Sequence, residues 1–567
     1  MSEFTAVGDP SHFQSASRVS FAGSDTATLS GPTPQGSKFT SSDVHLATSP
    51  LSPAAVPLPN TYIPATHENR TLVLCFDGTG DQFDSDNSNI VELFSMLKKD
   101  DPTKQMVYYQ AGIGTYTTPQ IATPMVAKMS KTSLYTLQTL DEMIAWNLDA
   151  HIMGGYEFLM EHYQTGDRIC IFGFSRGAYT ARCLAGMIHK VGLLPTGNRQ
   201  QVPFAYKMYT RPDDEGWKQS NAFRKAFSIV VDIEFLGVWD TVNSVGLFPR
   251  RLPFTTSNTI VRTFRHAVSL DERRAKFKAN LWNRPNKKEV KLAVNTALGG
   301  TSPSPTDGST PTTPTATESP ATSTVSKGEG SSTLKKGPKP VKKPASKLRA
   351  LERLYSHDRA TPTDIDEVWF SGCHCDVGGG SVANETKPNL ARIPLRWMIR
   401  ECFKTDTGIM FSANGLQSVG LDPVALLENP SQRPPALPVG SCRIQAIPKK
   451  PLDAEVQAAN NLAETSLTEE EFELRDAMSP VYDQLSLRWV WWILELIPLY
   501  HKFQRSDNTW KVWWGWNLGR GRKIPRQEKN GVRVHRSVKM RMEAGYADGK
   551  KYVPKANLDV SRVTWVD

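Results

Sequence analysis

A chain of 567 residues is long enough to bury one large core or several small ones, and its 39% hydrophobic and 22% charged residues are ordinary for a globular protein. The formal net charge is +10, carried partly by lysines between 335 and 347 and partly by Arg520, Arg522, Lys523 and Arg526. We interpret this charge as solvated surface, with attraction to anionic phospholipid as the alternative. No nucleic-acid partner is expected, because no recognised binding module accompanies the charge.

The sequence has no secretory signal, and no apolar run reaches the roughly 20 residues that a membrane span needs. Its seven cysteines lie mostly in apolar runs, which indicates reduced, buried thiols. We therefore expect a cytoplasmic protein, and leave peripheral contact with a membrane open.

Residues 1–66 are rich in Ser, Thr, Pro and Ala and are expected to form a disordered tail, because they bury too little apolar surface to offset their ordering entropy. Order is predicted to begin at 70–76, an apolar run typical of a buried strand, which ends in the turn Asp77-Gly78-Thr79-Gly80. A helical pattern near 90–97, a strand at 105–109 and a helical stripe over 140–152 follow.

The next predicted strand, 168–173, runs directly into Gly173-Phe174-Ser175-Arg176-Gly177, and an apolar helical stripe follows over 178–188. Further strands are predicted at 233–239 and 367–372. Strands that alternate with helices predict an α/β fold, α/β-hydrolase-like, with a mostly parallel sheet covered by helices on both faces.

Residues 284–363 interrupt this alternation, and within them 299–346 consist mainly of Ser, Thr, Pro, Gly and Lys with almost no large apolar side chain. We expect a disordered, basic, low-complexity insertion over 284–363. A fold can tolerate such an insertion because long loops cost little extra stability. The catalytic domain is then expected at 67–283 and 364–440. Residues 441–567 are expected to form a helical, Trp-rich extension packed on that domain.

The G-x-S-x-G pattern at 173–177 is weak by itself, but its place between a strand and a helix is specific. Such a turn strains the serine backbone, so Gly173 and Gly177 would avoid side-chain clashes. The Ser175 hydroxyl would lie at a helix N-terminus, where the dipole and free amides favour negative charge. The amide of Arg176 is expected to donate one oxyanion hydrogen bond. Gly78 or Thr79, in the first strand-end loop, is expected to donate the second.

A nucleophilic serine needs a base, and the base needs an orienting acid. In α/β-hydrolases the chain order is Ser, acid, His. Asp240 ends one predicted strand and His374 follows another, so we predict Asp240 as the acid and His374 as the base. His266 is the rival base. Asp376 is either a rival acid or a group that fixes the loop after His374.

Two other chemistries have less support. The first turn resembles the Asp-x-Asp-Gly-Thr turn of aspartyl phosphatases, but Cys75 stands where their nucleophilic Asp would be. Asp77 could instead hold the turn by accepting backbone N–H bonds. Cys373-His374-Cys375 suggests a metal, yet no second ligand pair stands at zinc spacing, so neither a metal nor an organic cofactor is expected.

Five motifs, taken in order, resemble the α/β-hydrolase catalytic domain of type VI secretion phospholipase effectors and their uncharacterised eukaryotic relatives. They are Leu74 to Thr79, Gly173 to Ala178, Gly237 to Val242, Arg265 to Ala267 and Gly372 to Gly380. The resemblance implies an α/β-hydrolase fold, lipid-ester hydrolysis, and Ser175, Asp240 and His374 as nucleophile, acid and base. The chain departs from the family at Cys375, where a Ser is usual, and in its tail and insertion, so a bacterial toxin's substrate or partner need not carry over.

Seven tryptophans crowd residues 489–516 and are followed by Arg520-Gly521-Arg522-Lys523. Such a cluster is most often internal packing, and the alternative is lipid docking or a cap over the substrate. The sequence thus predicts a serine hydrolase of carboxylic esters, with lipid or phospholipid esters as substrate and an acyl-enzyme intermediate. The alternative is a catalytically inactive binding scaffold of the same fold. The oligomeric state is not predicted.

Overall fold

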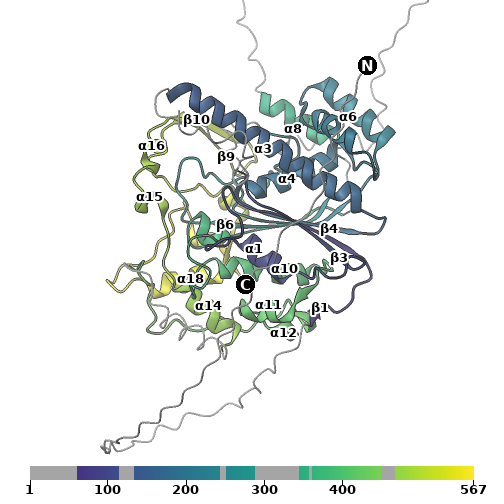
Figure 1. Ribbon diagram of the computed structural model, residues 1–567. Helices are drawn as coiled ribbons and strands as arrows, with labels where there is room; N and C mark the ends of the chain where they lie inside the picture. Colours follow the sequence, from purple (N-terminus) through teal and green to yellow (C-terminus); the bar gives the residue numbers. More distant parts are fainter. Residues whose placement is uncertain (1–60, 114–132, 243–250, 288–343, 357–360, 449–466) are drawn as a thin grey trace, which may run out of the picture. The chain divides into compact units, whose positions relative to one another are not determined.

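The computed structural model describes residues 61–113, 133–242, 251–287, 344–356, 361–448 and 467–567 (Figure 1). Most of the expected tail (1–66) and most of the expected insertion (284–363) lie outside these residues.

A large parallel sheet runs through the described part of the chain. Its eight strands there stand in the order β12-β11-β7-β6-β5-β4-β2-β3, and every neighbouring pair is parallel. Their bounds are β2 Thr71–Phe76, β3 Gln105–Gln110, β4 Arg168–Phe174, β5 Ile233–Trp239, β6 Val261–Ser269, β7 Asp364–Phe370, β11 Val532–His535 and β12 Val563–Val566. Because all strands point the same way, their carboxyl ends meet at one edge of the sheet, where sites of such folds lie.

Helices cover both faces of this sheet (Figure 1). One face carries α3 Ser133–His162, α4 Ser175–Val191, α5 Val202–Thr210 and α6 Asp214–Phe227. The other carries α1 Asn89–Met96, α10 Arg392–Lys404, α14 Glu469–Ala477 and α18 Arg536–Ala544. Shorter helices are η1 Arg199–Gln201, α9 His374–Gly378, α11 Ala413–Ser418, α12 Pro423–Glu428, α15 Gln484–Leu487, α16 Trp491–Glu495, α17 Gln527–Asn530 and η3 Val560–Arg562. The chain therefore has the predicted α/β fold.

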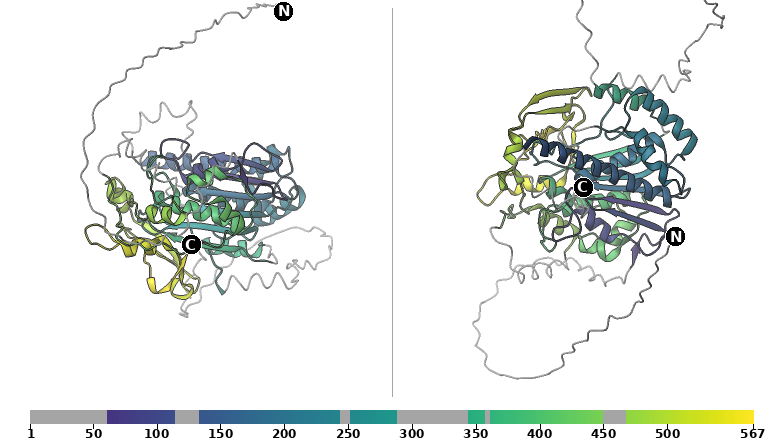
Figure 2. Two further views of the ribbon diagram at one scale, coloured as in Figure 1. Left: turned by 90° about the horizontal axis from the view of Figure 1, so that it is seen from below. Right: turned by 45° about the horizontal axis from the view of Figure 1, so that its top comes forward.

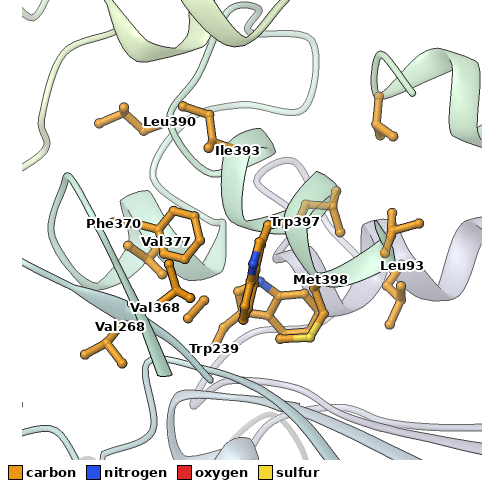
Figure 3. Packing of buried hydrophobic residues seen from close by; sticks show 14 of the residues in the cluster. Leu93, Trp239, Val268, Val368, Phe370, Val377, Leu390, Ile393, Trp397 and Met398 are labelled. Carbon is orange, nitrogen blue, oxygen red and sulfur yellow. The ribbon is translucent and has the colours of Figure 1, made fainter. Parts of the chain in front are cut away.

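Central strands are apolar throughout because both of their faces are buried. In β2 every residue is buried; Leu72 and Leu74 join the core beneath α3 and α4, whereas Val73 and Cys75 join the core beneath α1 and α10. In that second core Trp397 and Met398 of α10 lie over Trp239 (Figure 3). Each such buried side chain contributes about 1.5–3 kcal/mol of transfer free energy.

Strand β6 was not predicted, although it lies between β5 and β7 in the middle of the sheet. Its run contains Arg265 and His266, which interrupt the apolar pattern, yet both are buried. Arg265 pairs with Glu401 at 2.6 Å and with Asp364 at 2.7 Å. These partners compensate the buried charge of Arg265, and they are distant in sequence. The local pattern of residues therefore did not reveal the strand.

The C-terminal segment differs from the expected helical extension, because it enters the main sheet. Strands β11 and β12 extend the sheet beyond β7, so that β12 and β3 are its two edge strands. Figure 2 shows the yellow C-terminal segment packed directly against the rest of the fold. The segment also forms an antiparallel hairpin of β9 Leu499–Gln504 and β10 Trp510–Gly515. Strands of four residues are too short for alternation alone to identify.

Two expected boundaries also move. Residues before 67 already belong to the fold, since β1 Tyr62–Ile63 pairs with β8 Phe411–Ser412. Residues before 363 belong to it as well, since α8 Pro344–Leu354 buries Leu348 and Leu351 against Trp217 and Phe254. Leucines three positions apart give this basic helix an apolar face.

Candidate active site

Ser175 stands at the junction of β4 and α4, with a positive φ of 58°. This strained turn leaves no room for side chains on either flank. A Cβ added at Gly173 would lie 2.6 Å from the Ala178 Cα, and one at Gly177 would lie 2.2 Å from the Asp77 carbonyl oxygen. Both contacts are to backbone, so only glycine fits at these two positions.

Asp240 and His374 meet Ser175 at the same edge of the sheet. Asp240 follows β5, and His374 begins the short helix α9 after β7. His374 Nε2 lies 2.7 Å from Ser175 Oγ, and His374 Nδ1 lies 2.6 Å from Asp240 Oδ2. All three residues are buried: Ser175 is 5% exposed, Asp240 0% and His374 3%. The three side chains thus form one buried hydrogen-bonded chain.

The environment of His374 favours its neutral form. Burial lowers the pKa of His374, although the Asp240 carboxylate opposes that effect. Because a carboxylate only accepts, Nδ1 carries the ring proton and Nε2 is left to accept from the Ser175 hydroxyl. The rings of Phe174 and Phe277 lie 4.7 and 4.9 Å from the imidazole and shield it from water.

Asp240 is an ionised carboxylate with every lone pair engaged. Burial alone would raise its pKa, but Arg522 and His374 outweigh that effect and hold the pKa well below its usual range. Oδ1 also accepts the Ser269 amide at 2.9 Å. The φ of Asp240 is 38°, so a second residue of this cluster has a strained backbone, as functional sites often do.

The rival base and rival acid have other partners. His266 Nε2 accepts the Thr241 amide at 3.1 Å, and its Nδ1 lies 3.0 Å from Glu367 Oε1. Asp376 Oδ2 accepts the amides of Cys373 and Tyr482 at 2.8 and 3.0 Å, which closes the first turn of α9. Burial raises the pKa of Asp376 to about 7. Both residues therefore brace the backbone beside Asp240 and His374, and neither hydrogen-bonds to Ser175.

The first strand-end loop lies against the nucleophile turn. Asp77 Oδ1 accepts the Gly78 amide at 2.8 Å and the Ser88 hydroxyl at 2.5 Å, and Oδ2 accepts Tyr109 Oη at 2.8 Å. Asp77 thus holds the loop, and the Gly78 amide is already engaged. In the described part of the chain Thr79 has no hydrogen-bond partner for its amide or its buried hydroxyl.

The Cys-His-Cys run does not present three ligands to one point. Both nitrogens of His374 are engaged by Ser175 and Asp240, and the Cys373 thiol donates to the Asp271 carbonyl at 3.4 Å. Burial raises the pKa of both the Cys373 and the Cys375 thiols, which disfavours the thiolate that a metal ion binds.

Several residues of this site were not predicted from the sequence. Arg522, assigned to surface charge, is 3% exposed and pairs with Asp240. Glu272 accepts the His374 amide at 3.3 Å and pairs with Arg274 at 2.8 Å, and the Arg274 guanidinium lies over the Phe277 ring. Arg522 stands in the short basic run Arg520-Gly521-Arg522-Lys523, which carries no local signal of burial. Only the run Asp271-Glu272-Arg273-Arg274 just after β6 places charges at the correct sheet edge.

Comparison with known proteins gives a match over most of these elements. Residues 70–401 match the family model described as type VI secretion system phospholipase effector Tle1-like, catalytic domain. An uncharacterized protein of Saccharomyces cerevisiae (strain S288c) is 31% identical to this chain over an alignment of 555 residues. The match covers 85% of this chain and 80% of that protein.

Two solved structures are also similar. One is the crystal structure of an uncharacterized protein from Pseudomonas aeruginosa, 13% identical, with a TM-score of 0.30 over 78% of this chain and 70% of that one. The other is the Tle1 effector bound to the VgrG spike of the type 6 secretion system. It is 18% identical, with a TM-score of 0.21 over 39% of this chain and 50% of that one.

Proposed function

The chain belongs to the family of Tle1-like phospholipase effector catalytic domains, and from this membership we propose that it is a serine hydrolase of lipid carboxylic esters. The family itself indicates a hydrolase of the lipase or phospholipase type. The observation that carries the finer proposal is the hydrogen-bonded chain from Ser175 through His374 to Asp240.

The proposed reaction begins with proton transfer from Ser175 Oγ to His374 Nε2 as the oxygen attacks the ester carbonyl. Asp240 then stabilises the imidazolium, which returns its proton to the departing alcohol. The acyl group stays on Ser175 until a water molecule, activated by the same histidine, releases it as a carboxylic acid. Atoms and charges balance without a metal or an organic cofactor.

The oxyanion of the tetrahedral intermediate needs two amide donors. We assign the first to Arg176, which stands in the first turn of α4, where backbone amides have no helical acceptor. For the second, Thr79 is a better choice than Gly78, because the Gly78 amide already donates to Asp77.

The side chain of Arg176 supports a phosphate-bearing substrate. Burial lowers the pKa of its guanidinium, and this side chain makes no ion pair within the described residues. Arg176 directly follows the nucleophile in the chain, and guanidinium groups match phosphate geometry. We therefore favour phospholipids over neutral esters.

Peripheral contact with a membrane is the third part of the proposal. No helix in the described residues has both the length and the apolar character to cross a bilayer. However, α16, the β9–β10 hairpin and the residues next to them expose large apolar side chains. These are here called the tryptophan surface: Trp489, Ile493, Leu496, Tyr500, Trp514 and Trp516. Trp489 and Tyr500 are 74% and 75% exposed. Of the two sequence interpretations, packing describes Trp491 and Trp513, and lipid docking suits the exposed members.

Labelling with a fluorophosphonate probe tests the mechanism. We expect wild type to label at a single serine, and Ser175→Ala to lose the label together with at least about 10⁴-fold of its phospholipid hydrolysis. Ser371, in the loop before His374, offers a matched control: Ser371→Ala should still label, since none of the proposed chemistry uses its hydroxyl.

Equal labelling of wild type and Ser175→Ala would refute the proposal. A folded wild type that neither labels nor turns over any p-nitrophenyl ester or phospholipid would instead favour the scaffold alternative, in which the fold is kept for binding alone.

A further inference from the structure

One buried arginine from the C-terminal segment reaches the acid of the proposed triad. Arg522 lies between β10 and β11, outside the residues 70–401 that match the family model. Its Nη2 lies 2.8 Å from Asp240 Oδ2, and its Nη1 contacts Asp240 Oδ1. The guanidinium thus binds the carboxylate in the two-pronged geometry that is the strongest arginine–carboxylate contact.

Every donor of this guanidinium is used. Besides Asp240, Nη1 donates to the Ser269 hydroxyl at 2.9 Å, while Nη2 and Nε donate to the Phe277 carbonyl at 2.7 and 3.2 Å. Ser269 ends β6 and Phe277 shields His374. Arg522 therefore ties the acid to both the neighbouring strand and the loop against the base.

The backbone around Arg522 is held as firmly as its side chain. Its carbonyl accepts the Asn557 amide at 2.9 Å, and the neighbouring Ala556 amide donates to Leu270 at 2.7 Å. A Cβ at Gly521 would lie 1.8 Å from the Lys555 carbonyl oxygen, so only glycine permits this approach. The backbone at residues 521–522 is thus held against residues 555–557, which are themselves hydrogen-bonded to the residue after β6.

A fully buried carboxylate beside a neutral histidine needs a cation, because an uncompensated charge at low dielectric is costly. His374 is neutral in the resting site, so it cannot be that cation. Arg522 makes the closest cationic contact to Asp240 in the described chain. Arg274, the other buried arginine nearby, is paired with Glu272.

We propose that Arg522 is a positioning residue: it orients the Asp240 carboxylate and balances its buried charge, so the C-terminal segment completes the proposed active site. This inference rests on the proposed triad for its catalytic meaning. Its electrostatic content stands on the contact with Asp240 alone.

The same contact sets a direction for the titration of His374. The charged groups that act directly on this histidine are Asp240, Glu272 and Arg274. Arg522 is bound to the same Asp240 carboxylate. Arg522 offsets the attraction of Asp240 for a proton on the imidazole. Removal of its positive charge should therefore raise the pKa of His374. The rise of kcat/KM with pH should then have its midpoint at a higher pH than in wild type.

The test is an NMR titration of histidine Cε1–H signals in the full chain, with His374→Gln to assign the His374 signal. In Arg522→Met we expect the His374 midpoint to rise by about one pH unit or more. In Arg522→Lys the positive charge remains, but the two-pronged contact with the Asp240 carboxylate is lost. The His374 midpoint should therefore stay close to wild type, while kcat falls at least about tenfold. Guanidinium ion added to Arg522→Ala should restore part of the lost activity.

Arg536→Met is the matched control. Arg536 is another buried arginine of the C-terminal segment, paired with Glu473 at 2.7 Å, and its loss should lower thermal stability without moving the His374 midpoint. An unchanged His374 midpoint in folded Arg522→Met would overturn the inference. If wild type is inert toward esters and probe, yet Arg522→Met shifts the midpoint, the proposed function fails and the electrostatic role of Arg522 stands.

Discussion

At the scale of single residues, the side chains of Ser175, Asp240 and His374 are buried, and each of their polar atoms has a hydrogen-bond partner. Ser175 and His374 are 199 positions apart in sequence, yet their side chains are in hydrogen-bond contact. Positive φ at both Ser175 and Asp240 stores strain that the surrounding sheet must offset. His266 shows the complementary role, since it is buried at 0% exposure to hold the backbone after Asp240.

The pH dependence of activity follows from His374. A protonated imidazole cannot accept the Ser175 proton, so kcat/KM should rise with pH through the His374 pKa and then level off. Burial lowers that pKa, so the limb should have its midpoint below about 6.5, the ordinary histidine value. Rates for a p-nitrophenyl ester across pH 4–9 measure it, and a midpoint above about 7 would contradict the assignment of the base.

At the scale of elements, α16 and the β9–β10 hairpin connect the site to an exposed surface. Trp491 of α16 packs on Phe277 with ring centroids 5.6 Å apart, and Phe277 packs on His374. The buried Glu495 fixes α16 by accepting the Gly519 amide at 2.8 Å and the Asn517 side chain at 2.6 Å. Helix α16, which contributes to the tryptophan surface, is therefore joined through Phe277 to the base of the proposed triad.

Vesicle binding tests the tryptophan surface. The double variant Trp489→Ser, Trp514→Ser should lower co-sedimentation with anionic phospholipid vesicles at least about tenfold, since each exposed indole loses its interfacial contact. Hydrolysis of a water-soluble ester should change little, because neither side chain touches the triad. Phe227→Ser on α6, which is also exposed, is the control and should bind like wild type. Equal vesicle binding by the double variant would remove this surface as the contact.

At the scale of the whole molecule, both the main sheet and the candidate site contain residues of the C-terminal segment. Strands β11 and β12 cover the edge of β7, and Arg522 reaches Asp240 from the same segment. The match to the family model ends at residue 401, so these contacts lie in the part of the chain beyond it. The C-terminal segment is thus part of the fold rather than an addition to it.

Truncation distinguishes an integral segment from an appended one. A chain that ends at residue 440 loses two strands of the main sheet and the β9–β10 hairpin, and leaves Asp240 without Arg522. It should therefore aggregate or fail to label with fluorophosphonate. A chain that starts at residue 61 keeps every described element and should label like wild type. Circular dichroism and probe labelling measure both, and a folded, labelled 1–440 chain would contradict the role given to the C-terminal segment.

Local sequence was sufficient for elements whose signal is local. Apolar runs predicted β2, β4 and β5, and the G-x-S-x-G turn between a strand and a helix located Ser175. Parallel strands end at one edge, so Asp240 and His374 could be predicted to lie near Ser175 before any distance was known; that they act as a triad stays a prediction. Tertiary structure alone decided β6, the C-terminal strands and the burial of Arg522. Their polar side chains are stable inside only because partners far along the chain satisfy them, and no local pattern of residues records such partners.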